Sequence, residues 1–115
     1  MIKIYHNPRC SKSREACQIL NQIEKEEYEI IDYIKNPLST NEIKDLIQKL
    51  GISPLDLIRQ KEEIWKLNYK NKKMNDEEII EALHLHPKLI ERPIVVKNNQ
   101  AIIGRPPVLI KDFLN

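Results

Sequence analysis

The sequence predicts an α/β fold in which an N-terminal β-α-β unit and a C-terminal β-β-α unit are separated by a helical insert. Three observations predict it. Short alternating or β-branched apolar runs stand near both ends of the chain, apolar residues at helical spacing fill the middle, and turn residues separate these segments. The chain has 115 residues, which suits a single compact domain over residues 1–115.

The first unit is predicted from two strand patterns and one helical stripe. Residues 2–5 alternate apolar and polar side chains, and polar residues from His6 end this strand. A helix is expected to begin near Ser11, and residues 28–33 form the second strand candidate. The apolar side chains that share one side of the helix are Ala16, Ile19, Leu20 and Ile23. A strand, a helix and a strand in this order predict two parallel strands.

The insert is expected at about residues 36–90. Ser39 and Glu42 match a capping box at the start of an amphipathic helix, and Gly51 supplies its C-terminal stop. A short helical turn is expected after Pro54. A further helix is expected from about Asp76 to His86, because acidic residues in its first turn and histidines in its last suit the helix dipole.

The second unit returns to β structure. Residues 94–96 are all β-branched, the pair Asn98-Asn99 is a hairpin turn signal, and residues 101–103 are the returning strand. Residues 104–107 are expected to open a final helix. Its side chains expected to face the sheet are Val108, Leu109 and Phe113. The complete order of elements is that of a thioredoxin-like core with a helical insert between the second and third strands.

Composition restricts the classes of function. The 19 basic and 17 acidic side chains nearly balance, which predicts no general affinity for nucleic acid or membranes. No apolar run approaches the ~20 residues that span a bilayer, and the N-terminus lacks the apolar region of a signal peptide. We therefore expect a cytoplasmic, monomeric protein, whose two cysteines are thiols in a reducing compartment.

Cys10 is the candidate nucleophile, because it stands where the first strand gives way to the first helix. Backbone N–H groups of that first turn have no intrahelical acceptor and carry the positive end of the dipole, which favours a thiolate and attracts an oxyanion. The neighbours His6, Arg9, Lys12 and Arg14 are cationic or can become so. A buried apolar cysteine would not have such neighbours, so the sequence favours catalysis.

The second cysteine is expected to pack in the core. Cys17 lies two helical turns beyond Cys10, roughly 10 Å along the axis, and this exceeds the ~4.4–6.8 Å Cα separation of a disulfide. Position 13 is serine, so the motif is Cys-x-x-Ser, and its hydroxyl can donate to the Cys10 sulfur or cap the helix. A metal site from both cysteines with His84 and His86 has poor zinc spacing, and we expect no metal or bound cofactor.

Several segments together resemble the glutaredoxin-coupled arsenate reductase family, which is related to the Spx-type regulators. The active-site-like segment is His-Asn-Pro-Arg-Cys-Ser-Lys-Ser-Arg at residues 6–14, and the other matching segments are residues 32–37, 50–53, 58–59, 91–96 and 103–106. The similarity covers essentially the whole chain in the expected order. Any one of these motifs alone is weak, and together they are specific.

The resemblance implies a role for each matching residue. Cys10 would attack arsenic and form a covalent arseno-cysteine intermediate, His6 would help the thiol to lose its proton, and Ser13 would place a hydroxyl beside the sulfur. Arsenate would be bound by Arg59, Arg92 and Arg105, and Pro93 would be the cis-proline of the fold. Glutathione as co-substrate and glutaredoxin as partner would resolve the intermediate. Guanidinium groups also suit a tetrahedral oxyanion on physical grounds.

Two other functions remain open from the sequence. One is a glutathione-dependent thiol reductase with a different substrate. The other is a non-enzymatic Spx-like regulator that binds RNA polymerase, although such regulators typically carry Cys-x-x-Cys where this chain has Ser13.

Overall fold

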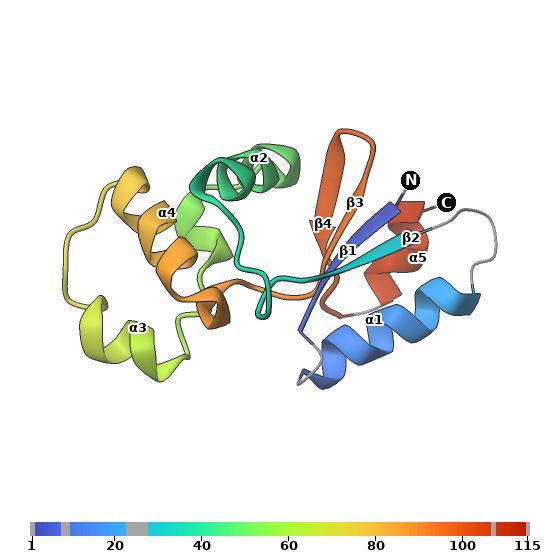
Figure 1. Ribbon diagram of the computed structural model, residues 1–115, viewed down its shortest axis with the longest axis horizontal. Coiled ribbons are helices and arrows are strands. Elements are labelled where there is room, and N and C mark those ends of the chain that lie inside the picture. Colours follow the sequence, from blue (N-terminus) through green and yellow to red (C-terminus); the bar gives the residue numbers. More distant parts are fainter. Residues whose placement is uncertain (1, 8–9, 23–27, 107, 115) are drawn as a thin grey trace. The chain divides into compact units, whose positions relative to one another are not determined.

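The chain contains two compact units, which we describe separately. Unit 1 comprises Met1–Lys35 and Arg92–Asn115, and unit 2 comprises Asn36–Glu91. The computed structural model (Figure 1) describes residues 2–7, 10–22, 28–106 and 108–114. Unit 2 covers nearly the same residues as the predicted insert, and the single-domain assignment stays a prediction.

Unit 1 is built on a four-stranded sheet with the strand order β2-β1-β3-β4. Its elements are β1 (Ile2–His6), α1 (Ser11–Gln22), β2 (Tyr28–Asp32), β3 (Ile94–Lys97), β4 (Gln100–Ile103) and α5 (Val108–Leu114). Strand β1 pairs in parallel with β2 and antiparallel with β3, and β3 pairs antiparallel with β4. The predicted β-α-β and β-β-α order and the parallel first pair are therefore confirmed.

The β3–β4 hairpin turns through two residues, as the sequence predicts. Lys97 pairs with Gln100, so only Asn98 and Asn99 lie between the strands. Asn98 has a φ of 59°, in the left-handed region that asparagine tolerates better than most residues.

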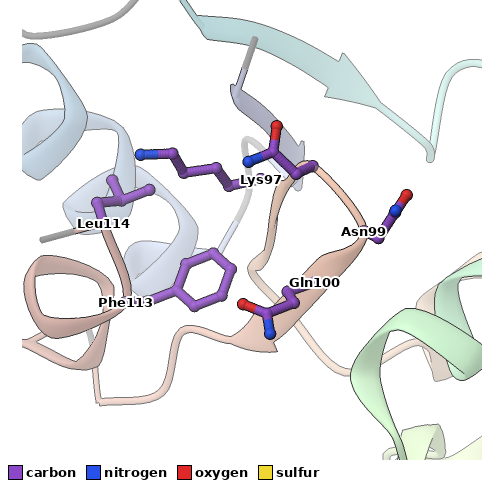
Figure 2. A pocket seen from close by; sticks show the side chains of 6 residues that line it. Lys97, Asn99, Gln100, Phe113 and Leu114 are labelled. Atoms are coloured by element: carbon purple, nitrogen blue, oxygen red, sulfur yellow. The ribbon is translucent and has the colours of Figure 1, made fainter.

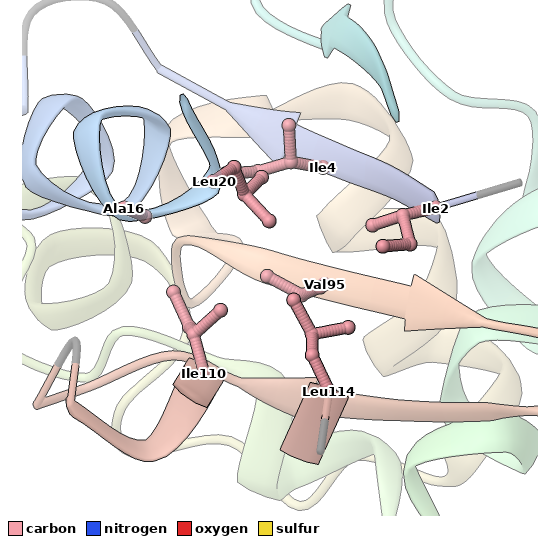
Figure 3. Close-up of a cluster of buried hydrophobic side chains, with 7 residues drawn as sticks. All are labelled: Ile2, Ile4, Ala16, Leu20, Val95, Ile110 and Leu114. Carbon is pink, nitrogen blue, oxygen red and sulfur yellow. The ribbon is translucent and has the colours of Figure 1, made fainter. Parts of the chain in front are cut away.

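The core of unit 1 lies on the sheet face that α1 and α5 cover. Figure 3 shows this cluster, and its members are Ile2, Ile4, Ala16, Leu20, Val95, Ile110 and Leu114. Ala16 and Leu20 confirm the predicted stripe of α1, while Ile23 lies outside the described residues. The predicted alternation in β1 holds for Ile2, Lys3 and Ile4, because the isoleucines are buried and Lys3 is exposed, but it is wrong for Tyr5, which is also buried.

The expected inner face of the last helix is wrong for two residues. Val108 is 58% exposed and Leu109 is 42% exposed, whereas Ile110 is fully buried. The helix begins at Val108, so the turn that faces the sheet carries Ile110 and Leu114 at helical spacing. Phe113 packs against the cluster as expected.

Unit 2 is helical. Its elements are α2 (Thr40–Leu50), the 3₁₀ turn η1 (Pro54–Leu57), α3 (Glu63–Asn68), α4 (Asp76–Leu85) and the 3₁₀ turn η2 (Pro87–Leu89). The capping box of Ser39 and Glu42 forms as predicted, and Gly51 ends α2 with a φ of 68°. Helix α3 was not predicted from the sequence. None of the described helices is long and apolar enough to cross a membrane.

Two backbone connections hold the C-terminal end of unit 2. Ile58 and Ile90 form an isolated antiparallel bridge, flanked by hydrogen bonds from Arg59 to Leu89 and from Glu91 to Leu57. Arg59 is thereby attached to the segment that ends at Glu91.

On α4, Nδ1 of His84 lies 2.7 Å from the carbonyl oxygen of Leu38, so this nitrogen carries the proton.

Candidate active site

The candidate residues of unit 1 lie near one end of its sheet. Strand β1 ends at His6, and the register opposes Tyr5 to Ile94 and Ile94 to Ile103. The start of β3 and the end of β4 therefore lie beside the end of β1. The Gly104 N–H donates to the Pro93 carbonyl at 2.8 Å and continues the β3–β4 pairing beyond the strands.

Cys10 occupies the residue directly before α1. Its N–H donates to the Asn7 carbonyl at 2.9 Å, and its own carbonyl accepts the Arg14 N–H at 3.1 Å, which is the first helical hydrogen bond. The N–H groups of residues 11–13 therefore lie at the free start of the helix. The side chain of Cys10 is half-buried, and the first turn of α1 contains no acidic residue. This position stabilises negative charge on a thiolate or on a bound anion.

Ser13 and Asn7 fix the turn that carries Cys10. Ser13 is fully buried, and its Oγ accepts a hydrogen bond from the Asn7 N–H at 3.3 Å. Since Oγ acts as acceptor here, the hydroxyl hydrogen can still be donated elsewhere. Asn7 is itself buried, and its backbone binds both Cys10 and Ser13. No individual role was predicted for Asn7, which stands in the polar segment that ends the first strand, although Asn before Pro is a turn signal. Of the neighbouring residues, Pro8, Arg9 and the side chain of Lys12 lie outside the described part.

His6 is partly buried at the end of β1. Burial lowers the pKa of its imidazole below the ordinary value of 6.5, and the charge of Arg14 acts in the same direction. The carboxylate of Asp32 and a backbone hydrogen bond to Ser13 oppose this shift. The register places Asp32 directly opposite His6. At neutral pH the ring is therefore uncharged, so it can accept a proton but supplies no positive charge.

The folded protein binds a proton at His6 less readily than the unfolded chain does. The stability linked to this group is therefore complete above pH 6.5 and is lost as the pH falls below it. We expect wild-type protein to lose more unfolding free energy between about pH 7.5 and about pH 5 than His6→Asn does. Urea unfolding of both proteins at the two pH values measures the difference. An equal loss in the two proteins would contradict the lowered pKa of His6.

Cys17 packs where the sequence analysis predicted. It is half-buried against the core cluster of unit 1, and burial raises the pKa of its thiol above 9.0. Neither cysteine forms a disulfide. A further contact was not predicted: Cys17 Sγ lies 3.7 Å from His6 Nδ1.

Two of the three predicted anion-binding arginines belong to unit 1. Arg92 is buried with 9% of its surface exposed, whereas Arg105 is exposed. Each precedes a cis-proline, because both the Arg92-Pro93 and the Arg105-Pro106 peptide bonds are cis. The cis state expected at Pro93 is thus present. The β3–β4 pairing brings both arginines to the sheet end that also carries His6 and the start of α1.

Arg59 belongs to unit 2. Its Nε lies 3.7 Å from a carboxylate oxygen of Glu62, and its side chain is 20% exposed. The Nη1 atom of Arg59 is buried and has no hydrogen-bond partner within the described residues. A guanidinium edge in this condition can bind an oxygen ligand.

Neither a metal-binding cluster nor the surface hollow described next is part of this site. The described residues contain no group of three or more histidine, cysteine, aspartate or glutamate side chains that could hold a metal ion. A surface hollow of about 400 Å³ lies at the opposite end of the β3–β4 hairpin, against the last residues of α5 (Figure 2). Its lining residues are Lys97, Asn98, Asn99, Gln100, Phe113 and Leu114.

Comparison with known proteins identifies the family. A family model described as ArsC family matches residues 5–113. The Escherichia coli K12 protein YfgD is 46% identical over 115 residues, covering 98% of this chain and 96% of that protein. The arsenate reductase of Haemophilus influenzae Rd is 41% identical over 114 residues, covering 96% of this chain and 97% of that protein. The solved structure of an arsenate reductase from Vibrio cholerae superposes with a TM-score of 0.89 at 42% identity, covering 96% of this chain and 95% of that one. Because the family model spans nearly the whole chain, the protein belongs to the ArsC family.

Proposed function

We propose that this protein reduces arsenate to arsenite with Cys10 as the nucleophile. The observation that carries the proposal is the half-buried thiol of Cys10 directly before the first helical hydrogen bond of α1. Proteins named arsenate reductase match over nearly the whole chain, which supports arsenate as the substrate. The fold of unit 1 supplies the helix N-terminus that such a reaction uses.

The proposed reaction forms and breaks one bond to arsenic in its first step. The Cys10 sulfur attacks arsenic(V), an S–As bond forms, and one arsenate oxygen leaves as water after taking up protons. Glutathione then adds to the arseno-cysteine intermediate, and glutaredoxin supplies the second thiol. Glutathione forms its As–S bond as a second arsenate oxygen leaves as water. The glutaredoxin thiol then attacks the glutathione sulfur, so that this As–S bond breaks, its electron pair reduces arsenic(V) to arsenic(III), and the two thiols end as one disulfide. Water hydrolyses the remaining Cys10–As bond, which releases arsenite and restores the Cys10 thiol. No bound cofactor is needed, because thiols carry all the electrons.

Other residues of the site bind the substrate and move the proton in the proposed reaction. In unit 1, Arg92 and Arg105 bind arsenate oxygens from the end of the sheet. Arg59 lies in unit 2, and its role in binding arsenate stays a prediction from the sequence. The neutral imidazole of His6 accepts the proton of the Cys10 thiol, and Ser13 donates its remaining hydroxyl hydrogen toward the sulfur. Pro93 fixes the backbone between Arg92 and β3.

A coupled assay tests this function. Purified protein, glutathione, glutaredoxin, glutathione reductase and NADPH are mixed with arsenate, and NADPH loss and arsenite are both measured. We expect arsenite to form in amounts equal to the NADPH oxidised. Phosphate is the matched control, because it has the same shape and charge but cannot be reduced under these conditions. Arsenite formation no faster than without the protein would overturn the proposal. If arsenate is not reduced but the protein accelerates NADPH oxidation with a disulfide substrate above the rate without the protein, the result would indicate a glutathione-dependent thiol reductase with a different substrate.

A further inference from the structure

The second cysteine of the chain contacts the histidine of the candidate site. Cys17 Sγ and His6 Nδ1 are 3.7 Å apart, which is hydrogen-bond distance for sulfur, although the two residues are eleven positions apart in the chain. The contact joins the end of β1 to the second turn of α1. It is therefore a tertiary contact made inside unit 1.

The two groups meet as neutral partners. Burial raises the pKa of the Cys17 thiol and lowers the pKa of the His6 imidazole, so neither is charged near pH 7. A neutral imidazole has one N–H donor and one acceptor nitrogen, and the partner of each nitrogen selects the tautomer. A thiol at Nδ1 therefore influences where the ring carries its proton.

Two residues on the same side of α1 contact the end of β1 and the residue that follows it. Ser13 and Cys17 are four residues apart, so they lie one above the other on the same side of the helix. Ser13 binds the Asn7 N–H through Oγ and also makes the backbone hydrogen bond to His6. The charged groups that face the ring are Asp32 on β2 and Arg14 on α1. Cys17 and Ser13 are thus neutral neighbours of His6, and Cys17 is the one that contacts Nδ1 through its side chain.

We propose that Cys17 is a positioning residue, which fixes the ring orientation and tautomer of His6 next to the turn that carries Cys10. The proposal rests on the proposed function in so far as His6 assists Cys10. It gives Cys17 a task other than disulfide formation, for which its separation from Cys10, roughly 10 Å along the helix, is too long.

Three variants of the full chain test this role. Cys17→Ala removes the contact and part of the cover over the ring, Cys17→Ser keeps a hydrogen-bonding group, and Cys17→Val fills the space without one. NMR of the imidazole ring gives the titration of His6 and the tautomer at each nitrogen. We expect Cys17→Ala to raise the pKa of His6 toward its ordinary value and to change the tautomer ratio, and Cys17→Ser to restore both.

Activity provides a second readout. Arsenate turnover at about pH 6 is expected to fall by roughly threefold to tenfold in Cys17→Ala, as loss of one modest hydrogen bond predicts, with the acidic limb of the pH profile moved to higher pH. If Cys17→Ala does not fold, Cys17→Val is compared with wild-type protein, and the tautomer ratio of His6 is the only readout. A His6 tautomer ratio that stays at the wild-type value in Cys17→Ala or in Cys17→Val overturns the proposal. If wild-type protein reduces no arsenate and the ring still responds to Cys17, the proposed function fails and the positioning role stands.

Discussion

Replacement of Cys10 by serine is expected to lower arsenate reduction by at least about 10³-fold, the order seen when a catalytic nucleophile is removed. A hydroxyl at the start of α1 has nearly the same size as the thiol but does not ionise near neutral pH. The stabilising N–H groups of the first turn then have no anionic sulfur to act on. The coupled assay measures the loss, and circular dichroism shows that the variant remains folded.

Cys17→Ser is the matched control for this experiment. It also exchanges one thiol for a hydroxyl on α1, but Cys17 is half-buried against the core and its thiol has a raised pKa. We expect it to retain turnover within about threefold of wild type. Iodoacetamide near neutral pH should therefore modify one thiol in wild-type protein and none in Cys10→Ser. A loss in Cys17→Ser as large as that in Cys10→Ser would instead show that the second thiol takes part in the redox cycle.

Most of the fold could be predicted because its signals are local. The alternation in residues 2–5, the β-branched run at residues 94–96 and the two asparagines between the last strands each depend on a few neighbouring residues. Helix α3 was missed for the opposite reason. It is six residues long, its one buried side chain is Trp65, and its Leu67 is 80% exposed, so no apolar stripe marks it.

The parts of the site that could not be predicted depend on contacts between elements. The position of Cys10 could be predicted, because sequence patterns indicate both the strand that ends before it and the helix that begins after it. The contact between His6 and Cys17 depends on how α1 crosses the end of β1, and periodicity gives no information on this. Asn7 was passed over because its role is carried by backbone groups that meet Cys10 and Ser13 only after folding.

The close packing of Gly104 beside the site could not be predicted from the sequence either. A Cβ atom at this position would lie 2.8 Å from Ile110 Cδ1, 2.9 Å from Ile110 Cγ1 and 3.3 Å from Pro93 Cγ. Ile110 is fully buried in the core cluster, so it has little space into which to move. The conformation of Gly104 is not in the left-handed region, so contact and not φ excludes a larger residue.

Gly104→Ala is therefore expected to lower the unfolding free energy by about 1–3 kcal/mol, the usual effect of overpacking a core. It should also lower kcat/KM for arsenate by at least roughly tenfold, because the added methyl group displaces Pro93, which follows Arg92, and shifts Arg105, which follows Gly104. Urea unfolding and the coupled assay measure the two effects.

The double variant Gly104→Ala with Ile110→Val separates crowding from a general loss of stability. Valine lacks the Cδ1 atom that makes the closest contact, and Ile110→Val alone should lower the unfolding free energy by about 0.5–1.5 kcal/mol. If crowding is the cause, the double variant loses less stability than the sum of the two single variants, and it recovers part of the activity. Strictly additive losses would mean that Gly104 acts on the site by some route other than its contact with Ile110.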